Sequence, residues 1–260
     1  MAGQGEEDGG LLTCLKIRQY RRIILTKPWT AHIITLFPEL FPGPLAASVL
    51  GRALENDIWS LNTHQLRDFA DDRHRSVDDA PAGGGPGMVM RADVLGRAID
   101  HVHDCAGQKL PMIYLSPRGE PFNQALAHEF AEGPGAIILC GRFEGIDERV
   151  IEARGLRDIS IGDYVMTGGE IAAMVFLDCV TRLLPGVVGE QASLEDESFE
   201  NGLLEYPHYT RPRSWEGLDI PEILLSGDHE RIAEWRRAEA LRQTAQRRPD
   251  LMARKKQIKS

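Results

Sequence analysis

Cysteine is scarce in this sequence, and its few positions form no metal-binding or disulfide pattern. There are four, far apart and without a CxxC pair or Cys/His ligand spacing: Cys14, Cys105, Cys140 and Cys179. This distribution argues against a zinc ribbon and a disulfide framework, so a reducing cytoplasm is the expected compartment. His101 and His103, two residues apart on a predicted helix, point in different directions, and no metal site is predicted.

Uninterrupted apolar runs are also absent. The longest apolar tract, roughly residues 171–188, contains Asp178 and Arg182. A charge at bilayer depth costs about 2.5 kcal/mol or more, so we expect a buried helix here and no membrane contact.

Positive charge is in deficit over the whole chain. The 260 residues hold 30 Lys and Arg against 39 Asp and Glu, a formal net charge of -9. Indiscriminate nucleic-acid binding draws on a Lys/Arg surplus and is therefore disfavoured. From Arg231 onward, however, ten Lys and Arg stand against three acids. Any contact with nucleic acid is predicted to be local.

Two common nucleotide-binding motifs are missing. The segment 83–88, Gly-Gly-Gly-Pro-Gly-Met, has neither the GxGxxG spacing of a dinucleotide fold nor the Lys-Ser/Thr ending of a P-loop. Its bare backbone N–H groups could cradle a phosphate, but the composition is more typical of a flexible surface loop.

What the sequence does contain is the alternation of an α/β protein, with a hydrophobic content of 42%, enough for a substantial core. Short β-branched apolar runs alternate with segments of helical period, which predicts βαβ units and a parallel sheet. We predict strands at 32–37, 109–115, 136–140 and 158–161, and helices at 45–54, 94–102, 121–131, 146–153 and 171–188.

Composition divides the chain into four predicted parts. Residues 1–30, first acidic and glycine-rich and then basic, lack the order of a secretory signal and are predicted to be a disordered extension. Residues 31–188 form the α/β domain. Residues 189–204 are acidic and poor in large apolar side chains, as in a flexible linker. Residues 205–260 are predicted to be a small helical domain.

Two glycine-containing segments each follow a predicted strand. They are 140–150, Cys-Gly-Arg-Phe-Glu-Gly-Ile-Asp-Glu-Arg-Val, and 160–170, Ser-Ile-Gly-Asp-Tyr-Val-Met-Thr-Gly-Gly-Glu. Because ligands gather beyond the carboxyl ends of parallel strands, these two loops predict one cleft. Gly141 and Gly145 would admit a ligand close to the backbone, and Glu144 could bond ribose hydroxyls. The apolar second loop suits an adenine; the alternative for the charged cluster 147–149 is a helix cap.

Other assignments stay open at this point. Arg182, near the end of the apolar helix, is either a structural ion-pair partner or a functional partner of the acidic linker. A nicotinamide-dependent oxidoreductase also has glycine-rich strand ends, but the missing GxGxxG and the missing acid after it count against that class. A noncatalytic RNA-binding module would explain the basic tail and leave the loops and linker acids without a purpose.

Several short motifs follow one another after Thr30. Besides segment 83–88 and the two glycine-containing loops, they are 35–39 (TLFPE), 114–117 (YLSP), 183–187 (LLPGV), 202–212 (GLLEYPHYTRP) and 224–229 (LLSGDH). In this order they resemble one family, the bacterial tRNA (guanine-N1) methyltransferases of the SPOUT class, which modify tRNA position 37 beside the anticodon. Each motif alone is weak, but their common order makes coincidence implausible.

The resemblance implies features that periodicity does not show. One is a SPOUT-type parallel sheet with a deep trefoil knot in its C-terminal half, where the general rarity of knots would predict an ordinary open sheet. Others are a homodimer with composite active sites, binding of the tRNA anticodon arm, and S-adenosylmethionine as methyl donor. The implied cofactor-binding residues are Tyr114, Leu115, Ser116, Pro117, Gly141, Glu144, Ile161, Gly162, Asp163, Tyr164, Val165, Met166, Gly168 and Gly169.

The resemblance also implies catalytic roles. Neutral guanine carries a proton on N1, so methylation there needs a general base and a donor to O6. The family uses an acid in the linker and an arginine at the end of the preceding helix, which Arg182 matches. Aligned from Ser198, the usual aspartate position holds Glu197, with Asp196 one residue earlier. Glu197 is the first candidate and Asp196 the second, and the participation of Mg²⁺ is left open.

Overall fold

A computed structural model of the chain describes residues 27–189 and 197–258, and the side chains as far as residue 253. The chain divides into two compact units, Met1–Gly189 and Glu190–Ser260, and each is considered by itself. Of the predicted extension, residues 1–30, the first 26 residues lie outside the described part of the chain. No helix in the described ranges is long and apolar enough to cross a membrane.

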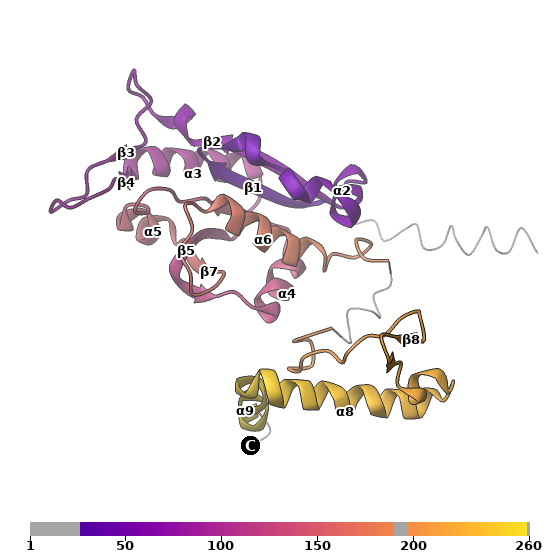
Figure 1. Ribbon diagram of the computed structural model, residues 1–260. Coiled ribbons are helices and arrows are strands. Elements are labelled where there is room, and N and C mark those ends of the chain that lie inside the picture. Colours follow the sequence, from indigo (N-terminus) through magenta and orange to yellow (C-terminus); the bar gives the residue numbers. More distant parts are fainter. Residues whose placement is uncertain (1–26, 190–196, 259–260) are drawn as a thin grey trace, which may run out of the picture. The chain divides into compact units, whose positions relative to one another are not determined.

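The first unit alternates strands and helices along the chain (Figure 1). Its strands are β1 (Trp29–Thr35), β2 (Trp59–Gln65), β3 (Asp78–Asp79), β4 (Val89–Met90), β5 (Met112–Pro121), β6 (Gly135–Leu139) and β7 (Arg157–Ser160). Its α-helices are α2 (Ser48–Glu55), α3 (Ala92–Ala106), α4 (Gln124–Glu132), α5 (Glu148–Arg154) and α6 (Glu170–Thr181). Short 3₁₀ turns are η1 (Pro38–Leu40), η2 (Gly43–Ala46) and η3 (Leu66–Phe69).

Five of these strands form one parallel sheet in the order β2-β1-β6-β5-β7. In the central register Ile33 lies beside Ile138, and Ile138 beside Ile113. The pairing of β5 with β7 is interrupted between Leu115 and Glu120. Because all five strands run the same way, the loops after β5, β6 and β7 emerge at one edge of the sheet.

Helices cover both faces of the sheet. On one face α3 and α5 enclose a core that includes Ile34, Val94 and Ile99. On the other face α4 contacts α6, and Phe176 packs against Phe130 with ring centroids 5.0 Å apart. The indole N–H of Trp29 satisfies the Phe130 carbonyl at 2.9 Å. Burial on both faces explains why the central strands read as continuous apolar runs.

All four predicted strands are confirmed, as β1, β5, β6 and β7, and the ends of β6 and β7 agree within one residue. Strand β1 begins three residues before its predicted start, and β5 continues six residues beyond its predicted end. Strand β2 was missed: it is an edge strand of mixed exposure, and its sequence WSLNTHQ lacks a continuous apolar run. The predicted helix 171–188 was too long. Helix α6 ends at Thr181, residues 182–188 turn, and Ile171 and Val175 leave part of the helix exposed rather than buried.

The second unit contains a small hairpin and two helices. Strands β8 (Ser214–Trp215) and β9 (Leu218–Asp219) pair antiparallel, followed by η4 (Glu222–Leu225), α8 (His229–Arg247) and α9 (Pro249–Ile258). The Asp228 carboxylate accepts the backbone N–H of Arg231 and so caps α8. Residues 197–204 form a turn against this helix, since the Leu204 N–H donates to the Thr244 hydroxyl at 2.8 Å.

Candidate active site

Three chain segments at the carboxyl edge of the sheet enclose one cavity of about 280 Å³. The first is the part of β5 where its pairing with β7 is interrupted, and the second and third are the loops after β6 and β7. Helix α6 begins where the third segment ends. The lining residues are 114–118, 141–145, 159–162, 164–169 and Ala172. Two of these loops were predicted to meet in one cleft, and the structure confirms that they do.

Glycine allows the second and third loops to touch. The Gly169 N–H donates to the Gly141 carbonyl at 2.9 Å. A Cβ atom at Gly169 would lie 2.8 Å from the Cys140 Cα, and one at Gly141 would lie 2.7 Å from the Tyr114 ring. Any larger residue would push these loops apart, so both glycines are required by close approach of the backbone.

The cavity is lined by both apolar and polar groups. Tyr114 is buried, and burial raises the pKa of its phenol, which therefore stays neutral and can donate a hydrogen bond. The Ser116 hydroxyl accepts the N–H of Arg118 at 3.2 Å. In the third loop the Tyr164 hydroxyl donates to the Ile161 carbonyl at 3.1 Å. These contacts leave main-chain groups and aliphatic side chains along the cavity wall.

A buried ion pair joins the loops to the sheet. The Glu170 side chain is 1% exposed, lies 2.8 Å from the Arg142 guanidinium, and accepts the Thr35 hydroxyl at 2.8 Å. Arg142 also donates to the Thr167 carbonyl at 3.4 Å and stacks over the Phe37 ring at 4.4 Å. From the second loop, Arg142 thus contacts the residue Phe37 after β1, the third loop and the start of α6, and Glu170 extends this network to Thr35 of β1.

The same surroundings determine the state of Cys140. Burial, and secondarily the Glu170 carboxylate, raises the pKa of this thiol well above its usual value. A buried neutral thiol is a poor nucleophile, so Cys140 has a packing role at the end of β6.

The glycine-rich segment 83–88 has two different parts. A Cβ atom at Gly83, Gly84 or Gly85 would meet nothing within 4 Å, as expected for an exposed loop. At its other end, the Met88 carbonyl accepts the N–H of Glu144 at 3.0 Å, and Gly87 packs directly against the Glu144 side chain. The base of this segment therefore supports the second cavity loop.

Thirteen of the fourteen residues implied for cofactor binding line the cavity; Asp163 is exposed and does not. Arg182 is the half-buried residue that ends α6, and it is not among the lining residues. Glu197 belongs to the second unit, where it lines a separate cavity of about 410 Å³ together with Tyr206 and Arg236. Asp196 lies outside the described residues.

Sequence reasoning missed Arg142 and Glu170 as site residues. Both stand inside the two glycine-containing segments, and a charged side chain flanked by buried strand and helix residues was the available signal. Thr35 and Phe37 belong to the motif 35–39, and nothing in the sequence indicates that Phe37 contacts Arg142 or that Thr35 contacts Glu170.

A parallel α/β sheet with a glycine-lined cavity at its carboxyl edge, apolar walls and a carboxylate at the rim is typical of a protein that binds a nucleotide-like ligand. A family model described as tRNA (Guanine-1)-methyltransferase TrmD matches residues 30–254. The chain belongs to this family.

Curated relatives agree with that assignment. The chain is 63% identical over 223 residues to the tRNA (guanine-N(1)-)-methyltransferase of Bartonella bacilliformis, covering 86% of this chain and 94% of the relative. It is 61% identical over 222 residues to that of Mesorhizobium japonicum, covering 85% and 95%. Identity to that of Zymomonas mobilis is 57% over 237 residues, covering 91% and 94%.

Proposed function

We propose that this protein transfers a methyl group from S-adenosylmethionine to N1 of the guanine at position 37 of tRNA, next to the anticodon. The observation that carries the proposal is the cavity formed by part of β5 and the loops after β6 and β7, in a chain 57–63% identical to relatives named tRNA (guanine-N(1)-)-methyltransferase. The carboxyl ends of parallel strands are where an α/β enzyme holds such a ligand.

The cavity residues suit the methyl donor chemically. Aliphatic side chains and main-chain groups of Ile161–Met166 can hold a flat adenine, and the exposed Glu144 at the rim can accept ribose hydroxyls or balance a positive sulfur. Gly141 and Gly169 lack the Cβ atoms that would collide with the Tyr114 ring and the Cys140 backbone beside the cavity. Bound there, the sulfonium supplies an electrophilic methyl carbon.

Proton removal and charge stabilisation fall to residues outside the cavity lining. We assign the base to Glu197, or to Asp196 beside it, and the O6 donor to Arg182. The carboxylate takes the N1 proton, N1 forms the new bond to carbon, and the sulfur keeps the electron pair of the broken bond. Arg182 offsets the negative charge that grows on O6 during proton removal.

The proposal includes a trefoil knot around the cavity and a homodimer with composite sites. The dimer is supported by large apolar side chains exposed beside the cavity and along α6: Phe37, Leu40, Phe143, Val165, Ile171 and Val175. Val165 is 85% exposed and Ile171 62%. Monomeric proteins rarely leave such a patch in water, and a second copy would cover it.

The remaining parts complete the proposed assembly. Residues 205–260 would hold the anticodon arm through their basic helices, and residues 189–204 would link them to the α/β domain and bring the acids to the cleft. The target guanine would leave its stack to reach the donor. Mg²⁺ could assist this reaction. Because the proposed substrate is tRNA, we propose that the reaction takes place in the cytoplasm.

The experiment is transfer of a labelled methyl group from S-adenosylmethionine to unmodified tRNA transcripts with guanosine or adenosine at position 37. Label in the guanosine transcript alone is the expected result. Label in both transcripts, or in neither despite calorimetric binding of the donor, would contradict the proposed target.

A further inference from the structure

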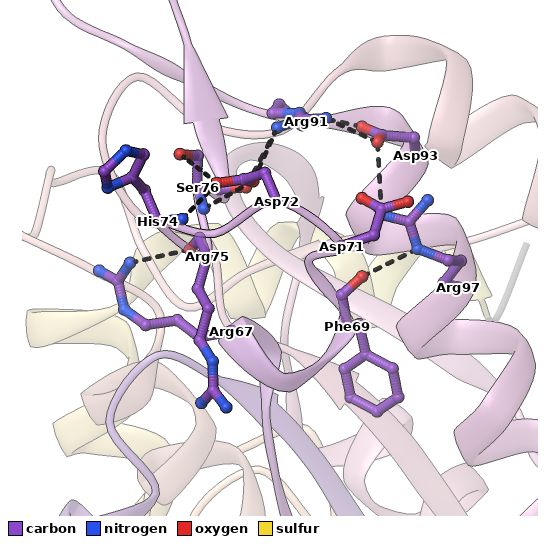
Figure 2. Close-up of polar contacts among 10 residues, drawn as sticks. All are labelled: Arg67, Phe69, Asp71, Asp72, His74, Arg75, Ser76, Arg91, Asp93 and Arg97. Atoms are coloured by element: carbon purple, nitrogen blue, oxygen red, sulfur yellow. Dashed lines mark hydrogen bonds and ion pairs between the residues drawn. The ribbon is translucent and has the colours of Figure 1, made fainter.

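The exposed loop between η3 and β3 is held by several side-chain hydrogen bonds. Arg67 donates to the Arg75 carbonyl and Arg91 to the Ser76 carbonyl, both at 3.3 Å, and Arg97 donates at 2.8 Å to the carbonyl of Phe69, the last residue of η3. Figure 2 shows how these contacts surround the turn. Arg97 also pairs with Asp71 at 3.0 Å, which holds the start of the loop against α3.

Asp72 fixes the tip of this loop from inside. Its carboxylate accepts the N–H groups of His74 at 2.9 Å and of Ser76 at 3.0 Å, as well as the Ser76 hydroxyl at 3.1 Å. Burial alone would raise the pKa of Asp72, but these hydrogen bonds, with the charge of Arg91, lower it. Asp72 therefore stays ionised and keeps the turn closed around neutral pH.

The contacts hold Arg75 in a left-handed backbone conformation, with φ at +51°. Glycine would adopt that conformation freely, whereas an arginine there is strained. A loop that served only as a connection would gain nothing from this arrangement. Strained side-chain-bearing residues in well-ordered loops are characteristic of functional sites.

The turn Asp72–Ser76, held in this way, exposes positively charged side chains to solvent. Arg73 and His74 form the turn and are exposed, and neither side chain has an ion-pair or hydrogen-bond partner among residues 27–189 and 197–253. Figure 2 shows the His74 ring pointing away from the network. Arg75 in the same turn is also exposed, but its guanidinium pairs with Asp68 at 3.2 Å.

The exposed, unpaired Arg73 contrasts with the charges in the rest of the first unit. Residues 27–189 contain 22 acidic side chains against 14 basic ones. Most arginines of the unit are paired with acids, among them Arg118, Arg149 and Arg154. A polyanion approaching this acidic unit would be repelled except where cations remain available.

We propose that the turn Asp72–Ser76 is an RNA phosphate-binding site, with Arg73 as its main contact and His74 beside it. A guanidinium matches the geometry of a phosphate, and a turn already ordered in the free protein binds with less loss of conformational entropy. Asp72 acts as a positioning residue. The site rests on the proposed function, because tRNA supplies the phosphates, and it gives the α/β domain its own hold on the substrate.

The test uses the full chain with Arg73→Ala and, as matched control, Arg52→Ala. Arg52 is another exposed arginine of the unit that forms no ion pair with the residues the structure describes. Binding of unmodified tRNA transcript is measured at several salt concentrations, and methyl transfer in parallel. Arg73→Ala should weaken tRNA binding about tenfold and lower the salt slope by about 0.7 to 0.9. Donor affinity and thermal unfolding should not change, and Arg52→Ala should match the wild type.

A second variant separates contact from positioning. Asp72→Asn should weaken tRNA binding in the same direction but leave the salt slope unchanged, because the arginine is still present. Wild-type tRNA affinity and slope in Arg73→Ala, or equal losses in Arg52→Ala, would overturn the turn proposal while methylation by the wild type stood. Arg73-dependent binding without any methylation would leave the phosphate site standing and remove the proposed reaction, and a wild type that binds no tRNA would overturn both.

Discussion

Arg142 is the side chain through which the cavity loops, β1 and α6 are held in one arrangement. Its charge is compensated by Glu170, which is 1% exposed, and removal of one member of a buried pair leaves the other uncompensated. Glu170→Gln should lower the free energy of unfolding by about 3 kcal/mol and weaken donor binding. Denaturant unfolding and calorimetric titration with S-adenosylmethionine measure the two effects.

The control for this prediction is Glu148→Gln, because the Arg118–Glu148 pair is exposed, with side-chain exposures of 62% and 70%. Exposed pairs contribute about 0 to 1 kcal/mol, so this variant should be close to wild type in both measurements. If the two variants lost the same stability, the Arg142–Glu170 pair would have no special role.

Glu197 and Asp196 are the two carboxylates that could remove the N1 proton. Replacement of the true base by alanine should reduce turnover by a factor on the order of a hundred or more, while donor binding persists. Glu200→Ala, in the same segment, is the control. Single-turnover methylation and calorimetry decide between the two acids, and full activity in both alanine variants would reject a base in this segment.

At the scale of elements, the contact between the second and third loops depends on Gly169. A Cβ there would lie 2.8 Å from the Cys140 Cα, so Gly169→Ala should separate the loops and weaken donor binding about tenfold or more, by analogy with other overpacked sites. Gly96→Ala, inside α3, is the matched control, because a Cβ there would meet only the Arg154 guanidinium, at an ordinary contact distance of 3.5 Å. This control should be neutral or stabilising by about 0.5 to 1 kcal/mol; equal donor affinity in both variants would contradict the close-packing argument.

Strands β1 and β2 carry a histidine pair that makes stability depend on pH. The His32 and His64 ring nitrogens lie 3.1 Å apart, and burial, followed by repulsion from His32 and His101, lowers the pKa of His64 from 6.5 to about 4. Between pH 6.5 and about pH 4, His64 is therefore protonated in the unfolded chain and neutral in the folded chain. The free energy of unfolding should fall as pH drops from about 6.5 to about 4.

Replacement of His64 by glutamine should flatten this fall, whereas His103→Gln, at an exposed position of α3, should leave it unchanged. Chemical denaturation at a series of pH values measures both. An identical pH profile for wild type and His64→Gln would show that the pair does not control acid stability.

At the scale of the whole molecule, the exposed apolar side chains of α6 predict self-association. Ile171→Glu and Val175→Glu should convert a dimer to a monomer in sedimentation and abolish methylation while the monomer remains folded, because a buried charge without a partner opposes assembly. Leu218→Glu, 70% exposed on the second unit, should stay dimeric. A stable and active wild-type monomer would remove the composite-site proposal.

Much of this molecule could be predicted from local patterns. The interior strands β1, β5 and β6 are recognisable because burial on both faces makes them continuous apolar runs, and the loops after β6 and β7 because glycine marks a close approach of backbones. The edge strand β2 could not be recognised, since a half-exposed strand carries polar residues at most positions. The end of α6 was placed too late because apolar residues continue through the turn that follows it.

The sequence by itself determined the class of fold, the chemical character of the cavity loops and the family. Strand periodicity, glycine placement and ordered motifs are local patterns, so they can be read directly from the order of the residues. Only the tertiary structure decided that Arg142 meets Glu170 and Phe37, that Glu170 meets Thr35, and that Arg67 and Arg91 donate to the turn around Asp72. The hydrogen-bonded partners are 8 to 135 positions apart. Which charges meet is fixed by the packing of the sheet and its helices, and no local propensity encodes it.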